Sequence, residues 1–407
     1  MSMQVPQRVD ESTVRQISEE LDEPEWLLET RLEALEALEE LEMPHVIRTP
    51  GRTWTNLTDL EYEAFVDPLN AAERKDQVGP DEVDVLSLSE AVDERPELLE
   101  EHFGSVVDPQ ENYLTALSTA LFSTGTVVYV PEGVDAEDVT IRTEMNSQSL
   151  FNYTLVVTET SSSVTILERQ STGDESDVDD DRERYYSGIV EVVAGENSQV
   201  QYGGLQNLDE ETYNYSVKRG DADTYATVDF VDGNLGSRLT KTEVSTELTG
   251  EGSESQIVGA FFGRDEQHFD LDSKVWHCAA HTTADLVMRG VVDDTARSVY
   301  EGVQDVGSEA WDTNSYQREN TLMLSDEAEA DAAPKLIINN HDTEASHSAT
   351  VGQVDEEDLF YMTSRGVDQD DATDMLVEGF FVPVLEEIEV DELREDVRTL
   401  IRKRLSE

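Results

Sequence analysis

Two segments of this sequence combine residue types that bind transition metals. His347 lies in a segment of small residues, 344–352, and the pair His277 and His281 brackets Cys278, the one cysteine of the chain. Neutral imidazole and thiolate are common ligands of zinc, copper and iron. Both segments are therefore candidate metal-binding sites, and the spacing of their residues indicates whether each can bind a metal by itself.

The segment from His277 to His281 does not make a metal site by itself. If it lies on a strand, Cys278 points away from both histidines because successive side chains alternate between the two faces. Four residues at ~3.3 Å each separate the histidines by about 13 Å, whereas a metal needs its ligand nitrogens within ~2.1 Å. We interpret both histidines as structural and Cys278 as a small, buried apolar residue.

His347 leaves two interpretations open on the residues alone. A histidine among Ala, Ser and Thr can cap a turn, or it can stay neutral near pH 7 and bind metal through one nitrogen. The motifs of nucleotide-binding loops, α/β-hydrolases, zinc proteases and thiol redox enzymes do not occur in the sequence. With 92 Asp and Glu, carboxylate pairs are too frequent to indicate a catalytic site.

The elements that must position these residues change in type along the chain. Helices are predicted at 25–43, 96–103 and 112–122, where apolar residues recur at helical spacing. From residue 126, short β-rich runs alternate with polar turns, which indicates a sandwich, a barrel or a solenoid without choosing among them. The predicted strands are 127–130, 139–142, 153–157, 164–167, 189–193, 199–202, 213–217, 226–230, 257–262 and, as the last strand, 335–338.

The end of the chain is predicted to be helical again. Helix is expected from Asp355 onward, with a break at Arg365 and Gly366 and a second amphipathic helix beyond it. Residues 344–352 would then connect the last strand to the first of these helices. Within the strand-rich part, the acidic segment 173–183 is predicted to be a solvated loop.

The net charge and the apolar content of the chain indicate which class of protein it belongs to. The 407 residues include 28 Lys and Arg against 92 Asp and Glu, for a net charge of −64, and only six of the basic residues are lysine. Such a chain repels itself in dilute buffer but not in molar salt, where the Debye length is about 3 Å. An apolar content of 37% argues for a folded protein. We interpret the chain as a globular protein from a salt-accumulating halophile.

Charge, hydropathy and cysteine content also indicate the partners and the cellular compartment of the protein. No basic patch is available to meet phosphate, so nucleic acid and anionic membrane are not expected as partners. No apolar run approaches 18 residues, and the start of the sequence has no signal-peptide pattern. A single cysteine excludes an internal disulfide. The expectation is a soluble, cytoplasmic protein.

One long stretch resembles a known family. Residues 346–372 read SHSATVGQVDEEDLFYMTSRGVDQDDA, which resembles the signature of the SufB/SufD family of iron–sulfur cluster assembly proteins. The resemblance continues upstream through 317–325 and 128–134. It also includes Glu23 to Trp26 near the start, and so covers most of the chain.

The resemblance implies a fold. The core of the family is a right-handed parallel β-helix flanked by helical ends. On this chain it implies a mainly helical amino-terminal region at 1–125, a β-helix core at 126–345 and a carboxy-terminal helical domain at 346–407 that docks an ATPase.

The resemblance also implies a role for His347. In the SufB branch a histidine flanked by two glutamates works with a cysteine just before the last strand. Here the flanks are Ser346 and Ser348, the matching cysteine position is Glu319, and no cysteine stands near 217–220. These departures resemble the SufD branch. His347 is therefore expected to be a transient iron–sulfur ligand at a partner interface, because clusters are held mainly by thiolates and one imidazole cannot hold one alone.

The implied function is that of a non-catalytic scaffold. The resemblance implies pairing with a SufB-like subunit and docking of a SufC-like ATPase, with no tightly bound cofactor on this chain. Iron, sulfide and a reduced flavin would be ligands of the assembled complex. A SufB-type scaffold that builds the cluster itself and a carbohydrate-acting β-helix enzyme are the alternatives. The candidate interface residues are Glu319, Asn320, Leu359, Phe360, Arg365 and Phe380.

The net charge generates a first prediction, on salt. The fold should require roughly molar salt, because only then is the repulsion among 64 excess negative charges screened within a few ångströms. Circular dichroism during dialysis into about 50 mM salt should show loss of structure. An unchanged spectrum and melting temperature would contradict the halophile interpretation.

Overall fold

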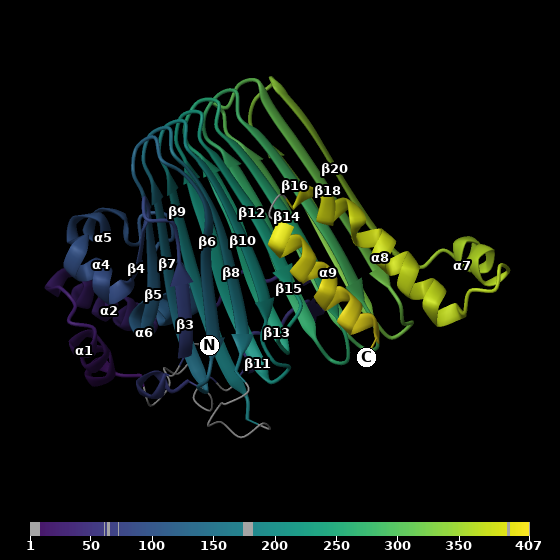
Figure 1. Cartoon of the computed structure of the whole chain (residues 1–407), viewed down its shortest axis with the longest axis horizontal. Coiled ribbons are helices and arrows are strands. Elements are labelled where there is room, and N and C mark those ends of the chain that lie inside the picture. Colours follow the sequence, from purple (N-terminus) through teal and green to yellow (C-terminus); the bar gives the residue numbers. More distant parts are fainter. Residues whose placement is uncertain are drawn as a thin grey trace.

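The chain folds into a long stack of parallel strands with helices at its start and end (Figure 1). The computed structural model describes residues 9–60, 62, 66–71, 73–173, 182–388 and 391–406. Most of the acidic segment predicted as a loop, 173–183, lies outside the described residues. Within the described part, two sheets of nine strands each run along the stack, and a separate hairpin is formed by Arg48–Thr49 and Arg52–Thr53 (β1 and β2).

The first helices and strands form the amino-terminal part. Its helices are α1 (Glu11–Glu20), α2 (Glu25–Ala37), η1 (Pro68–Asn70), α4 (Leu88–Glu94), α5 (Pro96–His102) and α6 (Tyr113–Leu121), and its sheet strands are β3 (Glu73–Val78) and β4 (Asp84–Ser87).

The stacked strands divide between the two sheets by their order in the chain. The odd-numbered strands are β5 (Thr124–Val130), β7 (Ser149–Thr158), β9 (Arg184–Ala194), β11 (Thr212–Ala222), β13 (Leu239–Leu248), β15 (His268–His277), β17 (Arg297–Val306) and β19 (Glu329–Ile338). The even-numbered strands are β6 (Asp135–Met145), β8 (Ser163–Thr172), β10 (Gln199–Asn207), β12 (Thr227–Asn234), β14 (Glu254–Gly263), β16 (Thr283–Val292), β18 (Thr313–Met323) and β20 (Thr343–Gln353).

Each strand pairs in parallel with the strand two places along the chain, so the chain winds as a solenoid. Glu254 lies beside Thr283, and Thr283 lies beside Asn314, so one turn takes about 30 residues. The sharp corners between strands use residues with left-handed backbone conformation. The corner that follows an odd-numbered strand has such a residue in successive turns, for example Tyr225 (φ 56°) and His281 (φ 63°). The β-helix core flanked by helices is therefore confirmed.

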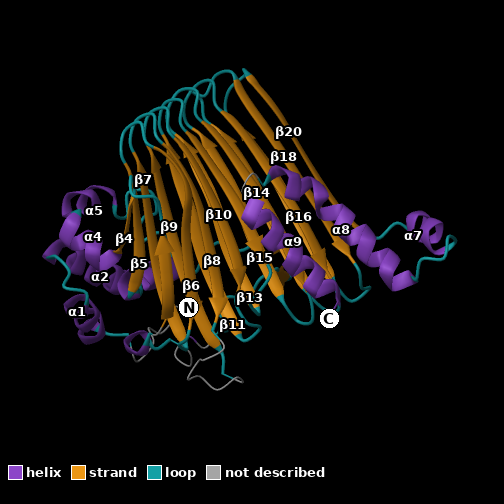
Figure 2. Ribbon diagram, in the orientation of Figure 1, coloured by secondary structure: helices purple, strands orange, loops and turns teal. Residues whose placement is uncertain are grey.

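The solenoid has one internal core and two covered outer faces. Between the sheets lie stacked apolar side chains such as Ile166, Val192 and Phe230. The outer face of the odd-numbered sheet is covered near its start by the amino-terminal helices, with Leu117 among the buried contacts. The outer face of the even-numbered sheet is covered by α8 (Gln369–Glu387) and α9 (Asp391–Ser406). Figure 2 shows both helices lying across the strands.

Two expectations about the strands need correction. The run 335–338 belongs to β19, but it is not the last strand, because β20 follows it and contains the whole segment 344–352. That segment is extended because its backbone pairs in register with β18. The amino-terminal part also contributes strands, since β3 and β4 pair antiparallel with β6 and β5 and close the first turn.

The carboxy-terminal helices follow the predicted pattern, whereas the helix predicted at 25–43 ends at Ala37. Helix α7 (Glu356–Thr363) begins after Asp355, whose side chain accepts a hydrogen bond from the Glu357 amide. The predicted break falls at Gly366, which has φ 90°. In the part of the chain that the structure describes, no helix is long and apolar enough to cross a membrane.

Several of the few lysines are paired with buried carboxylates. Lys241 binds Asp270 and Asp272 at 2.7 and 2.9 Å, and Lys274 binds Glu243 at 2.5 Å. The last of these carboxyls has its pKa lowered to about 2 because the charges of Lys274 and Arg219 outweigh its burial. These pairs lie on the outer face of the odd-numbered sheet, beyond the part covered by the amino-terminal helices.

One buried carboxylate joins the amino-terminal part to the solenoid. Glu191 on β9 accepts hydrogen bonds from the amides of Gly104, Val106 and Val107 at 2.7 to 2.8 Å, and from the Tyr153 hydroxyl. Four donors therefore converge on one side chain that is fully buried. Burial raises its pKa, and the donors hold the loop after α5 against the sheet.

We predict that Glu191→Gln lowers the free energy of unfolding by about 2–3 kcal/mol, because an amide NH2 then faces buried N–H donors. Glu196→Gln, an exposed change just beyond the same strand, should alter it by less than about 0.5 kcal/mol. Chemical denaturation in concentrated salt measures both. Equal effects of the two substitutions would mean that the carboxylate does not join the two parts.

Candidate functional site

His347 lies within β20, the last strand of the even-numbered sheet (Figure 1). It sits directly beside Gln317 of β18 in the parallel register. Side chains at paired positions of neighbouring parallel strands point to the same face. Gln317 is buried, and its amide reaches the backbone of Gly302 on β17 in the opposite sheet. His347 therefore lies on the inward face of the final turn, yet it is exposed because no described strand covers that turn.

A buried carboxylate lies next to this position. Glu319 is two residues from Gln317 on the same inward face and is 1% exposed. It accepts hydrogen bonds from the Thr321 hydroxyl at 2.5 Å and from the Thr350 amide. Its Oε2 has no hydrogen-bond partner among the described residues. Burial raises the pKa of Glu319 to about 7, so the group exchanges a proton near neutral pH.

Further polar groups line the same end of the interior. Tyr300 of β17 is buried, and both burial and the charge of Glu319 raise the pKa of its hydroxyl. A side-chain hydrogen bond with Gln317 opposes this rise. The mouth, as we call the inward-facing residues of the last two turns at this end, thus combines an imidazole, a carboxyl group and an amide. Its members are Tyr300, Gln317, Glu319 and His347.

The donors at the mouth suit a metal ion better than a whole iron–sulfur cluster. Imidazole and carboxylate bind iron, whereas clusters are held mainly by cysteine thiolates. In the described part of the chain, no group of three or more His, Cys, Asp and Glu is arranged to hold a metal ion. A cluster at this position would be cargo of the protein, with its remaining ligands supplied from elsewhere.

The structure separates some of the residues that the sequence grouped together. Asn320 follows Glu319 but points to the outer face, since alternate residues of β18 are buried and exposed. Phe380 is half-buried, and its ring lies 4.9 Å from the guanidinium of Arg289 on β16. Arg365 stacks on Tyr361 at 3.4 Å within the region of α7.

The histidine–cysteine segment falls at the end of β15 and in the turn beyond it. His277 is buried, with Nδ1 2.8 Å from the Thr282 hydroxyl and Nε2 3.0 Å from the Gln304 amide oxygen. Burial lowers its pKa to about 4, so it is a neutral structural histidine. His281 lies in the turn rather than on the strand, and its Nδ1 is 2.9 Å from Asp312. The extended spacing assumed from the sequence therefore does not apply.

The prediction that Cys278 is buried is wrong. Its side chain is exposed in the turn between β15 and β16. Although a thiol is hydrophobic, Cys278 is not buried, because the turn places it outside both sheets. Burial and nearby carboxylates raise the pKa of the thiol, which reduces its thiolate fraction.

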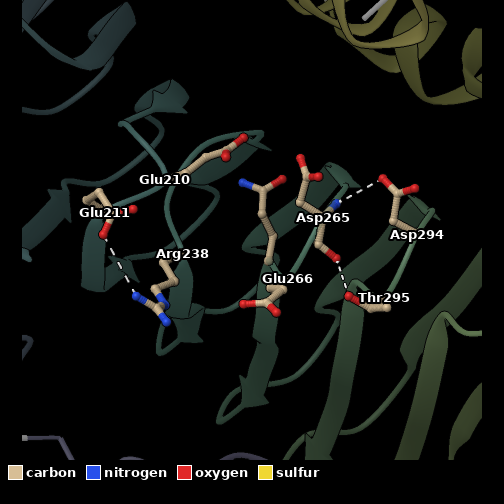
Figure 3. Close-up of a pocket in the computed structure, with 8 residues that line it drawn as sticks. Glu210, Glu211, Arg238, Asp265, Glu266, Asp294 and Thr295 are labelled. Atoms are coloured by element: carbon tan, nitrogen blue, oxygen red, sulfur yellow. Dashed lines mark hydrogen bonds and ion pairs between the residues drawn. The ribbon is translucent and has the colours of Figure 1, made fainter. Parts of the chain in front are cut away.

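A surface cavity lies along the corners of earlier turns. Figure 3 shows this cavity of about 550 Å³, whose lining includes Glu210, Glu211, Arg238, Asp265 and Asp294. The described lining contains no aromatic side chain. Sugar-binding solenoids use aromatic faces, so this cavity does not favour a carbohydrate-acting enzyme.

A second surface feature is formed by the carboxy-terminal helices. Phe360 is 74% exposed and Met375 is 58% exposed. A groove of about 400 Å³ between α8 and α9 is lined by Met375, Val382, Leu385 and Ile401, among others. In Figure 1, α7 projects beyond β20, away from the sheets. Large exposed apolar side chains grouped in this way are typical of protein interfaces.

The raised pKa of Glu319 yields a prediction on pH. Its native pKa of about 7 exceeds the ordinary value of ~4.5, so the native state holds the proton more tightly than the unfolded chain does. The stability from this group is complete below about pH 4.5 and is lost as pH rises through about 7, a change of about 3 kcal/mol. Glu319→Gln should remove this part of the slope.

Denaturation at about pH 5 and about pH 8 measures the slope for the wild type and the variant. The exposed Glu327 provides a control, since Glu327→Gln should keep the wild-type slope. If Glu319→Gln also keeps it, the carboxyl group is ionised in the native protein at both values.

The comparisons with known proteins agree with this architecture. Residues 140–380 match the family model described as SUF system FeS cluster assembly, SufBD core domain, and residues 55–141 match the SufBD protein N-terminal region. The chain is 30% identical to the iron–sulfur cluster assembly protein SufD of Bacillus subtilis (strain 168), covering 98% of each chain.

Other relatives include members of both branches. The chain is 27% identical to the iron–sulfur cluster assembly protein SufB of the same B. subtilis strain, over 93% of this chain and 89% of that protein. It is 28% identical to a SufBD family protein of Staphylococcus haemolyticus, over 94% and 90%. These identities are too similar to separate the branches. The extent of the match nevertheless establishes that the chain belongs to the SufB/SufD family, a component of the SUF system for iron–sulfur cluster assembly.

Proposed function

We propose that this protein is a SufD-like, non-catalytic scaffold subunit in the cytoplasm. In this proposal it pairs with a SufB-like subunit at the end of the solenoid formed by β19 and β20, and it docks a SufC-like ATPase on its carboxy-terminal helices. The observation that carries the proposal is the position of His347, exposed on the inward face of a terminal strand.

The partner subunit would cover the exposed edges of the two sheets. Strands β19 and β20 are 10 and 11 residues long, and each ends its sheet within the described structure. A long edge with few charges is a template for pairing with another chain. Strand β20 carries one charged residue, Glu344, and Ile337, Ile338 and Val351 are exposed nearby. A second solenoid of the same family offers a matching edge.

The cluster would form between the two subunits. His347 supplies an imidazole at the mouth, and the thiolates that a cluster needs would come from the partner, because Cys278 lies in a different turn. Glu319 would stay close to the cluster without being bound to it. Its native pKa of about 7 suits it to exchange a proton when sulfide or a thiol binds.

The ATPase would bind where apolar side chains remain exposed on the carboxy-terminal helices. Helices α8 and α9 use one face to cover the even-numbered sheet, which leaves Met375 and Val382 of α8 exposed. Phe360 is exposed on α7. Deletion of 355–407 would also uncover the sheet, so single substitutions at exposed positions separate docking from folding.

The alternative within the family is a SufB-type scaffold that assembles the cluster by itself. Such a protein needs thiols at the mouth, where this chain has Glu319 and His347. The 27% identity to a SufB keeps this alternative open to a direct test, since a SufB-type chain would accumulate cluster when reconstituted alone.

We predict that His347→Ala lowers the iron and sulfide retained by the anaerobically reconstituted complex while leaving its size unchanged. Loss of an exposed histidine has little effect on stability, so the defect should be confined to the cluster. Elemental analysis and size-exclusion chromatography measure both properties. The control His281→Ala removes another exposed histidine and should behave as wild type, as should Cys278→Ser. A wild-type cluster yield in His347→Ala, or equal losses in Cys278→Ser, would refute the assignment.

A separate prediction concerns the ATPase. Phe360→Ser should weaken its binding about tenfold or more, the usual cost of removing a central aromatic residue from an interface. Tyr225, which is 59% exposed at a solenoid corner, provides the control, and Tyr225→Ser should bind normally. Titration calorimetry with the purified ATPase measures both. Normal binding by Phe360→Ser would place the docking surface elsewhere.

A further inference from the structure

Part of the interior of the first turns is polar, beside the apolar core that the same strands form with residues such as Ile166 and Val192. Strand β3 closes this end by pairing antiparallel with β6, and it turns Glu73 and Lys75 inward. Glu168 of β8 and Tyr186 of β9 meet them from the stacked strands, and both are fully buried. None of these residues belongs to the mouth, which lies at the opposite end of the stack.

Two carboxylate oxygens in this interior have no donor. Glu168 accepts a hydrogen bond from the Tyr202 hydroxyl on Oε2 at 2.8 Å, and Glu73 accepts one from the Thr124 hydroxyl on Oε1. The other oxygens, Oε1 of Glu168 and Oε2 of Glu73, are buried without a hydrogen-bond partner among the described residues. Buried polar atoms of this kind indicate a water or an ion.

The two carboxylates face the same space. Both act electrostatically on the Tyr186 hydroxyl, whose pKa they raise together with burial. Both also act on the Lys75 ammonium, where they oppose the lowering of its pKa by burial. The interior of the first turns therefore brings both unpaired oxygens toward one region.

The charges in this region do not balance. Lys75 is the one cation among them, and its hydrogen bonds go to the Asn152 amide oxygen at 2.8 Å and to the Thr124 hydroxyl at 3.4 Å. Two other buried cations, Arg184 and Lys218, are bound to Asp209 and Asp232. Two carboxylates and one ammonium leave one negative charge buried. A buried charge is costly unless it is paired or coordinates a metal ion.

We propose that Glu73 and Glu168 hold a monovalent metal cation, sodium or potassium, inside the first turns of the solenoid. One positive charge neutralises the region, whereas a divalent ion would leave it positive. The two unpaired oxygens are hard ligands suited to such an ion, and waters complete its coordination. The site is structural, joins β3 to the stacked strands, and is independent of the proposed function.

Thermal unfolding of the full chain tests the site. The midpoint in potassium or sodium chloride should exceed that in choline chloride of equal concentration by about 2–4 °C or more, because choline is too large to enter. Glu168→Gln should abolish this difference. Glu191→Gln is the matched control, since it alters a buried glutamate whose oxygens both have donors, and it should retain the difference.

Crystals of the wild-type protein grown with rubidium chloride provide a test that does not depend on a variant folding. An anomalous peak within bonding distance of Glu73 Oε2 and Glu168 Oε1 is the expected result. Absence of the peak would overturn the proposal and leave a water molecule as the occupant. So would an equal difference in unfolding midpoint between potassium or sodium chloride and choline chloride in the wild type and in Glu168→Gln.

Discussion

The structure depends on the pairing of backbone hydrogen bonds between stacked parallel strands. Strands inside the stack take their partners from the turn before and the turn after, because buried N–H and C=O groups must be satisfied. This requirement sets the repeat of about 30 residues and the left-handed corners. It also makes the two ends different from the middle. An end strand lacks one neighbour, so each end must be closed or joined to something else.

The two ends meet this requirement in different ways. At the start, β3 and β4 turn antiparallel and are only six and four residues long, which limits further pairing. At the other end, β19 and β20 keep full length and parallel register. The candidate site lies at this second end, where an inward-facing histidine remains accessible. The interior of the solenoid is thus accessible at this end because no further described strand follows β19 and β20.

The covering of the outer faces of the two sheets explains where the excess negative charge of the protein lies. Apolar strand faces near the start are buried by the amino-terminal helices, and those of the even-numbered sheet by α8 and α9. On the odd-numbered sheet beyond the amino-terminal helices, Lys241 and Lys274 are neutralised by neighbouring carboxylates. The excess negative charge is left on turns and exposed helix faces, where salt screens it. Because exposed pairs contribute little, apolar burial remains the main source of stability.

Much of the fold could be predicted from local pattern and from resemblance. Every residue of β7 is buried, and strands that are buried on both faces tend to contain apolar runs, as 155–157 does here. The helices of the carboxy-terminal part have clear capping and breaking residues in Asp355 and Gly366. Strands β15 and β17 are not predicted from the sequence, because they carry charged residues that are paired with residues of neighbouring turns. The resemblance indicated the β-helix, which periodicity did not.

The sequence by itself determined the family, the order of helical and strand-rich parts, and the importance of the segment around His347. Tertiary structure alone decided that this segment is a strand, since its pairing partner, β18, lies about 30 residues earlier. It also decided that Glu319 faces inward while Asn320 faces outward, and that Cys278 is exposed in a turn. The physical reason is that strand register and the burial of a turn are set by contacts between successive turns, which no local pattern contains.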